Sequence, residues 1–147
     1  MNDELITNIL LELKVISHIK CGMKINTGQP QLAIHYPSAI HSFLRWFNSE
    51  NRQKNIDRIT KTFASTFSLV DSLLQQTPKE KQRNIVLARL LQAIHGAVEG
   101  LHRLKTTYSL DHHIVSCLDV QIENAQIYSN NIIASMGLTH SERLMLE

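Results

Sequence analysis

Apolar residues recur at steps of three and four positions along most of the chain, a spacing that gathers them on one face of an α-helix. The pattern predicts helices at about 3–20, at 37–76 with a polar break near 48–51, at 78–108 and at 110–136. Residues that favour helix ends stand at the ends of these segments, namely Gly22, Pro37, Pro78 and Gly137. In the first segment the row expected to be buried is Leu5, Ile9, Leu13 and Ile16.

Residues 22–36 follow a different pattern. Two short alternating pieces, 23–25 and 32–34, flank a stretch of turn-forming residues at 26–30. This arrangement predicts a short β-hairpin or an ordered loop. The chain contains no repeat and no linker, so we expect residues 1–147 to form a single all-α domain, an antiparallel bundle of about four main helices.

Composition supports one folded domain. With 43% hydrophobic and 19% charged residues, the chain differs from disordered proteins, which combine low hydrophobicity with high net charge. The net charge of +2 neither requires nor excludes a polyanionic partner. The two cysteines, Cys21 and Cys117, are far apart and predict reduced thiols. Because the N-terminus is acidic and no apolar run approaches the ~20 residues of a membrane span, we expect no membrane and a cytoplasmic location.

A stripe of small residues lies on the segment 78–108, formed by Ala93, Gly96, Ala97 and Gly100. A glycine inside a helix costs about 1 kcal/mol relative to alanine, so two of them indicate a packing reason. One interpretation is a tight crossing by another helix of the same chain. The other is a contact with a second subunit or a protein partner.

A basic segment surrounds the single tryptophan. Arg45 and Arg52 share a helical face beside Trp46, and Arg58 and Lys61 follow. Arg and Trp dominate interface hot spots, which favours a protein interface at Arg45, Trp46 and Arg52. The alternatives are a solvated face with Trp46 partly in the core, and binding of nucleic acid or a phosphate ligand through the four cationic residues.

His95, Glu99 and His102 are spaced at i, i+4 and i+7, which places them on one helical face. Glu99 and His102 also match the Glu-x-x-His spacing of di-metal carboxylate bundles, and their side chains are ligands for divalent transition metals. However, this face is turned about 100° away from the apolar row. A metal-binding bundle is therefore an alternative to three polar residues at the edge of the core.

The sequence contains no glycine-rich phosphate loop and no nucleophile or zinc motif, so we expect no enzymatic activity and no cofactor. The stretches GMKIN (22–26), RWFNSENR (45–52) and GLHRLKTTY (100–108), followed by Asp111, together resemble small, helical, largely uncharacterised proteins of large double-stranded DNA viruses. This resemblance spans about residues 20–111. It implies a viral accessory or virion-associated protein, in the host cytoplasm or the virion, and transfers no activity to any residue.

The leading hypothesis from these observations is a non-enzymatic helical interaction or assembly protein. The small-residue stripe and the segment around Trp46 are its predicted contact surfaces. Its expected partner is another protein or a second copy of the chain.

Overall fold

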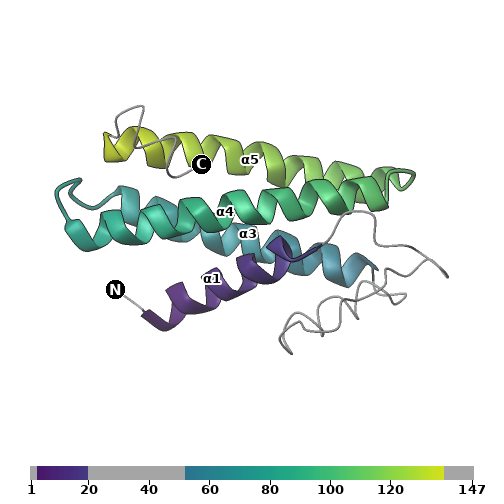
Figure 1. Ribbon diagram of the computed structural model, residues 1–147, viewed down its shortest axis with the longest axis horizontal. Helices are drawn as coiled ribbons and strands as arrows, with labels where there is room; N and C mark the ends of the chain where they lie inside the picture. The colour runs from purple at the N-terminus through teal and green to yellow at the C-terminus, as the bar shows by residue number, and fades with distance from the viewer. Residues whose placement is uncertain (1–2, 20–51, 138–147) are drawn as a thin grey trace.

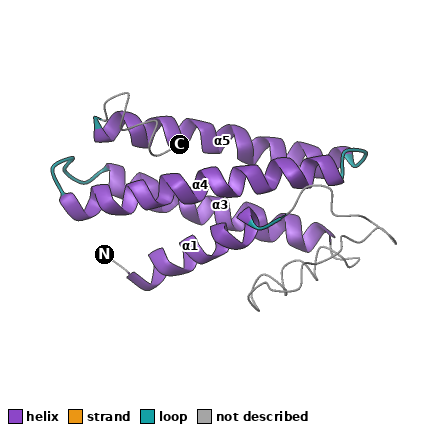
Figure 2. Cartoon of the chain, viewed as in Figure 1, coloured by secondary structure: helices purple, strands orange, loops and turns teal. Residues whose placement is uncertain are grey.

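The computed structural model describes residues 3–19 and 52–137, and this part of the chain is a bundle of helices lying side by side (Figure 1). The helices are α1 (Asp3–Ser17), α3 (Arg52–Leu74), α4 (Lys81–Thr107) and α5 (His112–Met136). The described residues contain no strand (Figure 2), which confirms the all-α prediction for them. The hairpin predicted at 22–36, the helical turns before residue 51 and the C-terminal tail lie outside the described residues.

Local capping sets both ends of α5. The side chain of Asp111 accepts a hydrogen bond from the Ile114 amide at the start of α5, and Gly137 ends that helix in the left-handed conformation with φ 60°. The prediction that the preceding helix starts at Pro78 is wrong by three residues. Residues 77–80 form a turn instead, in which the Glu80 amide donates to the Thr77 carbonyl.

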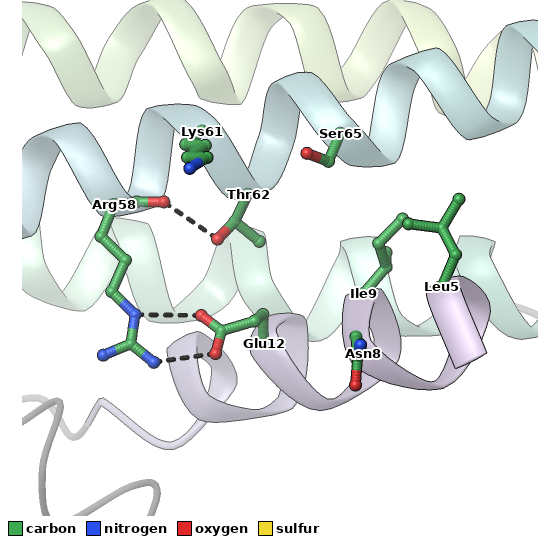
Figure 3. A pocket seen from close by; sticks show the side chains of 8 residues that line it. All are labelled: Leu5, Asn8, Ile9, Glu12, Arg58, Lys61, Thr62 and Ser65. Carbon is green, nitrogen blue, oxygen red and sulfur yellow. Dashed lines mark hydrogen bonds and ion pairs between the residues drawn. The ribbon is translucent and has the colours of Figure 1, made fainter.

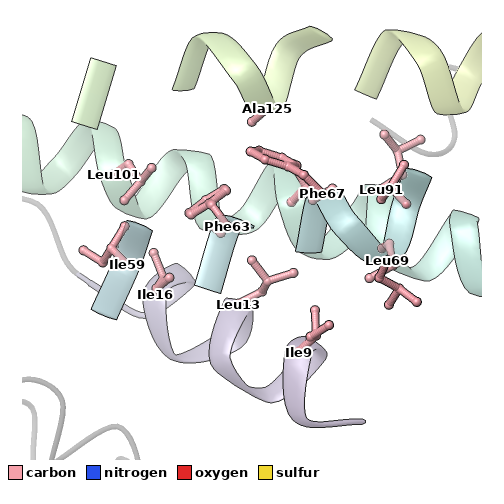
Figure 4. Packing of buried hydrophobic residues seen from close by; sticks show 14 of the residues in the cluster. Ile9, Leu13, Ile16, Ile59, Phe63, Phe67, Leu69, Leu91, Leu101 and Ala125 are labelled. Carbon is pink, nitrogen blue, oxygen red and sulfur yellow. The ribbon is translucent and has the colours of Figure 1, made fainter. Parts of the chain in front are cut away.

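The helices contact one another unequally. α1 packs mainly on α4, while α5 packs on both α4 and α3, and contacts between α1 and α3 are sparse. Figure 1 shows the short α1 inclined to the other three helices, on the side of the bundle away from α5. The core is apolar and takes residues from all four helices. Leu13, Phe63 and Leu101 are completely buried in it (Figure 4).

α1 crosses α4 at the two glycines of the small-residue stripe. A Cβ atom added at Gly100 would overlap the carbonyl oxygen of Ile16 and lie 2.9 Å from its carbonyl carbon. One added at Gly96 would lie 3.3 Å from the Cβ of Ser17. The packing reason for these glycines is therefore a tight crossing by a helix of the same chain.

Arg103 holds the C-terminal end of α1 at this crossing. Its guanidinium donates from Nη2 to the Ser17 carbonyl at 2.8 Å and from Nε to the Ile19 carbonyl. Carbonyl groups in the last turn of a helix have no partner within the helix, and a cation there also faces the negative end of the helix dipole. Arg103 thus fixes where α1 ends on α4.

Arg83, in the first turn of α4, joins the ends of three helices at the other end of that helix from Arg103. Its side chain is fully buried, and Nε donates to the Leu73 carbonyl at 3.0 Å in the last turn of α3. Nη1 donates to the Asn84 side chain at 2.6 Å, and Nη2 donates to the Ser135 hydroxyl at the end of α5. These acceptors are neutral, so the C-terminal dipoles of α3 and α5 provide favourable potential for the buried charge.

We expect Gly100→Ala to lower the free energy of unfolding by about 2 kcal/mol, because the added methyl overlaps backbone atoms that no side-chain rotation can move. Gly96→Ala is the matched control. Its methyl meets only a serine side chain, and the gain in helix propensity of about 1 kcal/mol offsets that crowding. Urea denaturation followed by circular dichroism measures both. Equal midpoints for the two variants would contradict the close crossing at Gly100.

We expect Arg83→Met to lower the free energy of unfolding by about 2–3 kcal/mol, because the buried carbonyl of Leu73 and the partly buried hydroxyl of Ser135 lose their donor. Arg89→Met, at an exposed position of the same helix, should change it by less than about 0.5 kcal/mol. The same denaturation experiment compares the pair. An equally small effect at both arginines would show that Arg83 does not hold the helix ends together.

Candidate interaction groove between α1 and α3

The sparse contact between α1 and α3 leaves a surface groove, formed by two adjoining cavities. The first has a volume of about 330 Å³ and is lined by Leu5, Asn8, Ile9, Glu12, Arg58, Lys61, Thr62 and Ser65 (Figure 3). The second, of about 490 Å³, is lined by Leu5, Ala64, Ser65, Ser68, Leu69 and Ser72. Because Leu5 and Ser65 line both cavities, the two form one continuous surface, here called the α1–α3 groove.

One end of the α1–α3 groove is polar and positively charged. The Arg58 guanidinium binds the Glu12 carboxylate through two bonds, Nε to Oε2 at 3.0 Å and Nη2 to Oε1 at 2.8 Å. This two-point geometry is the strongest that arginine makes with a carboxylate, and it ties α1 to α3 (Figure 3). Lys61 is exposed beside the pair. With Arg58 and Glu12 compensating each other, Lys61 leaves this end with a net positive charge.

The other end of the groove is apolar and free of charge. Ile9 and Leu69 are buried beneath it, whereas Leu5 at its edge keeps 44% of its surface exposed. The prediction that Leu5 is buried in the first helix is therefore wrong, because α3 does not cover this part of α1. The adjoining face of α3 exposes only small side chains, Ala64, Ser65, Ser68 and Ser72. Small side chains allow the axis of another helix to approach closely.

Contacts with α5 determine which face of α3 is left open. The ring of Phe67 stacks on that of Tyr128, with centroids 4.3 Å apart and planes 7° from parallel. The Tyr128 hydroxyl donates to the Asp71 carboxylate at 2.9 Å. This hydrogen bond is the main cause of a raised pKa at Tyr128, and burial and the Asp71 charge add to it. α3 is thereby held on α5, and its serine-bearing face points toward solvent.

The predicted basic site is only partly within the described residues. Arg58 and Lys61 lie together in the α1–α3 groove. Arg45 and Trp46 lie outside the described residues, and Arg52 begins α3 with a side chain that is not described. Binding of nucleic acid or a phosphate ligand through these residues, and a protein interface at Trp46, stay predictions.

The predicted metal-binding residues do not form a ligand set. The side chains of Glu99 and His102 are exposed and that of His95 is partly buried. Within residues 3–19 and 52–137, no group of three or more His, Cys, Asp or Glu side chains is placed to hold a metal ion. The Nε2 atom of His95 is buried and has no hydrogen-bond partner in this part of the structure. A bound divalent metal stays a prediction.

Of the two contacts predicted for the small-residue stripe, the structure shows the crossing by another helix of the same chain, α1. Ala97 and Gly100 are buried, and α1 occupies the surface next to Gly100. Gly96 and Ala93 are partly buried. A contact of the stripe with another chain stays a prediction, and the surface that it would need at Gly100 is already occupied.

The sequence reasoning missed the residues that line the groove at Glu12, Ser65 and Ser68. One signal was present, since the nine residues between Lys61 and Asp71 carry no charge although three of them, Ala64, Ser65 and Ser68, are exposed. Surface helices usually carry charged residues on their solvent-facing side.

Among the described helices, none combines the length and apolar character that a membrane crossing requires. No family model, no curated protein and no solved structure matches the chain.

We expect Asp71→Asn to lower the pKa of Tyr128 toward its ordinary value of 10.0, because the carboxylate that holds the phenolic proton is gone. Since the pKa in the folded state is raised, the contribution of Tyr128 to stability is complete below about pH 10. It is lost as the pH rises through the folded-state pKa. Asp71→Asn should therefore reduce the loss of stability that occurs at alkaline pH.

Tyrosinate absorbance during an alkaline titration measures the pKa, and Tyr128→Phe identifies the transition that belongs to this residue. Denaturation midpoints at neutral and alkaline pH give the stability difference. An unchanged titration in Asp71→Asn would contradict the assignment of Asp71 as the main cause.

Proposed function

We propose that this chain is a non-enzymatic helical interaction or assembly protein, and that it binds a second protein chain in the α1–α3 groove. One observation carries the proposal: α1 leaves an elongated face of α3 uncovered, beside the exposed side chain of Leu5. An amphipathic helix that lies in a hydrophobic groove is a common mode of recognition between proteins.

The chemistry of the groove supports binding of protein rather than catalysis. Glu12 is the only carboxylate among the described lining residues, and Arg58 holds both of its oxygens. A general base needs a free carboxylate or imidazole that can take a proton. The buried centres of protein interfaces are instead depleted in charge, and the residues of α3 that line the second cavity, from Ala64 to Ser72, carry none.

We propose an antiparallel bundle as the scaffold that presents this groove. Arg83 joins the ends of α3, α4 and α5, and Arg103 holds the end of α1 on α4. Both walls of the groove thus belong to helices that are fixed before any partner arrives. A preformed site loses little conformational entropy on binding. The role in a viral assembly that the resemblance implies would suit such a protein, and it stays part of the proposal only.

Photocrosslinking from inside the groove tests this function. Ser68 is replaced by p-benzoylphenylalanine in the full chain, and the cells that express it are illuminated. Ser116, an exposed serine on α5, is the matched control. We expect a covalent protein adduct from position 68 and none from position 116. The absence of any adduct at 68, or the same adducts at both positions, would contradict binding in the α1–α3 groove.

A further inference from the structure

We propose that this chain binds a divalent transition metal of the zinc class at a site formed by His113 and Cys117 of α5 and Gln53 of α3. None of these residues lines the α1–α3 groove, so the inference goes beyond the proposed function and does not rest on it. It follows from three donor atoms that two helices bring together in their first two turns.

The nitrogen and sulfur donors lie on one face of α5. His113 and Cys117 are four residues apart, the spacing at which two histidines of one helix bind zinc in metalloproteases. The Cys117 sulfur lies 3.9 Å from Nε2 of His113. A zinc ion at its ordinary distances of about 2.3 Å from sulfur and about 2.05 Å from nitrogen would make an angle of about 130° with these two atoms. A side-chain shift of a few tenths of an ångström brings that angle to the tetrahedral value.

Gln53 supplies the third donor. Its Oε1 atom lies 2.8 Å from Nε2 of His113, and its amide nitrogen donates to the Asp57 carboxylate at 2.9 Å. The bond to Asp57 fixes which way the amide points, so the oxygen is the atom turned toward His113. Nε2 of His113 therefore carries a proton that it donates to this oxygen. A metal ion would take the place of that proton, with the imidazole keeping its proton on Nδ1 instead.

The surroundings of the three donors suit a cation. His113 and Gln53 are exposed, and Cys117 is a partly exposed free thiol, so an ion can enter and water can complete its ligands. Only two of the protein donors are His or Cys side chains, and the site depends on Gln53 and water for its other positions. Binding releases the thiol proton of Cys117 to solvent, because the thiolate is the ligand. The thiolate and the nearby Asp57 carboxylate then balance the charge of the ion.

Cobalt titration of the untagged, metal-free full chain tests this site, because Co²⁺ occupies zinc sites and is coloured. We expect a near-ultraviolet thiolate-to-cobalt band that saturates at one ion per chain and that Zn²⁺ removes, since zinc binds such ligands more tightly than cobalt. Cys117→Ser should abolish the band. His113→Ala should raise the cobalt dissociation constant at least about tenfold, since even residues that only orient a metal ligand usually contribute that much.

Two matched controls remove the same kinds of side chain elsewhere. His112→Ala removes the neighbouring exposed histidine, whose side chain is turned about 100° around the helix from that of His113. Cys21→Ser removes the other thiol of the chain. Both controls should leave the band and the dissociation constant unchanged. Circular dichroism of each variant shows that the helices are intact.

Stability gives a readout that does not depend on colour. Zn²⁺ should raise the urea denaturation midpoint of the wild-type chain but not that of Cys117→Ser, because an ion that binds the folded state stabilises it. The absence of a cobalt band in the wild-type chain would overturn the site. A band that persists in Cys117→Ser, a band that is lost in Cys21→Ser, or a dissociation constant that His113→Ala leaves unchanged would also overturn it.

Discussion

The close approach of two backbones, where α1 crosses α4 at Gly100, is the constraint on which the shape of this protein depends. Because Gly100 has no side chain, the carbonyl of Ile16 lies where a Cβ atom would otherwise be. Arg103 then binds the carbonyl groups at the end of α1. The helix is thus fixed by its C-terminal part, and it lies inclined to the other three. The α1–α3 groove is a direct consequence, since a short helix held in this way cannot cover the full length of α3.

Two arginines stabilise the bundle through backbone carbonyl groups and neutral side chains. Arg83 is the more demanding case, because it is fully buried and three helix ends provide its acceptors. A buried cation is costly unless each donor finds a partner. With all of its hydrogen bonds made, the Arg83 guanidinium restricts the ends of α3 and α5 to one arrangement. The combination of Arg83 with Arg103 explains how, within residues 3–19 and 52–137, α1 and α3 keep their places on the two sides of the groove.

Periodicity and capping predicted the helices of the described region well, because both are local. Asp111 and Gly137 stand at the two ends of α5, as expected. The helix start predicted at Pro78 was wrong, because Pro78 belongs to a separate turn before the helix. Periodicity finds the apolar face of a helix but not how far a neighbour covers it, which is why Leu5 was misassigned. The pair between Glu12 and Arg58 joins residues 46 positions apart, and no local signal predicts such a contact. The glycine stripe predicted a close crossing without showing which chain provides it.

The groove combines features that are individually common and informative together. A single exposed leucine is ordinary on a protein surface. Here Leu5 stands beside a face of α3 with small uncharged side chains, and the positive charge of Lys61 lies at one end of the same groove. The apolar part would bind many helices with little discrimination, since burial of apolar surface has no direction. The charge at the Lys61 end would favour one orientation of the bound helix, because electrostatic complementarity determines register more than affinity.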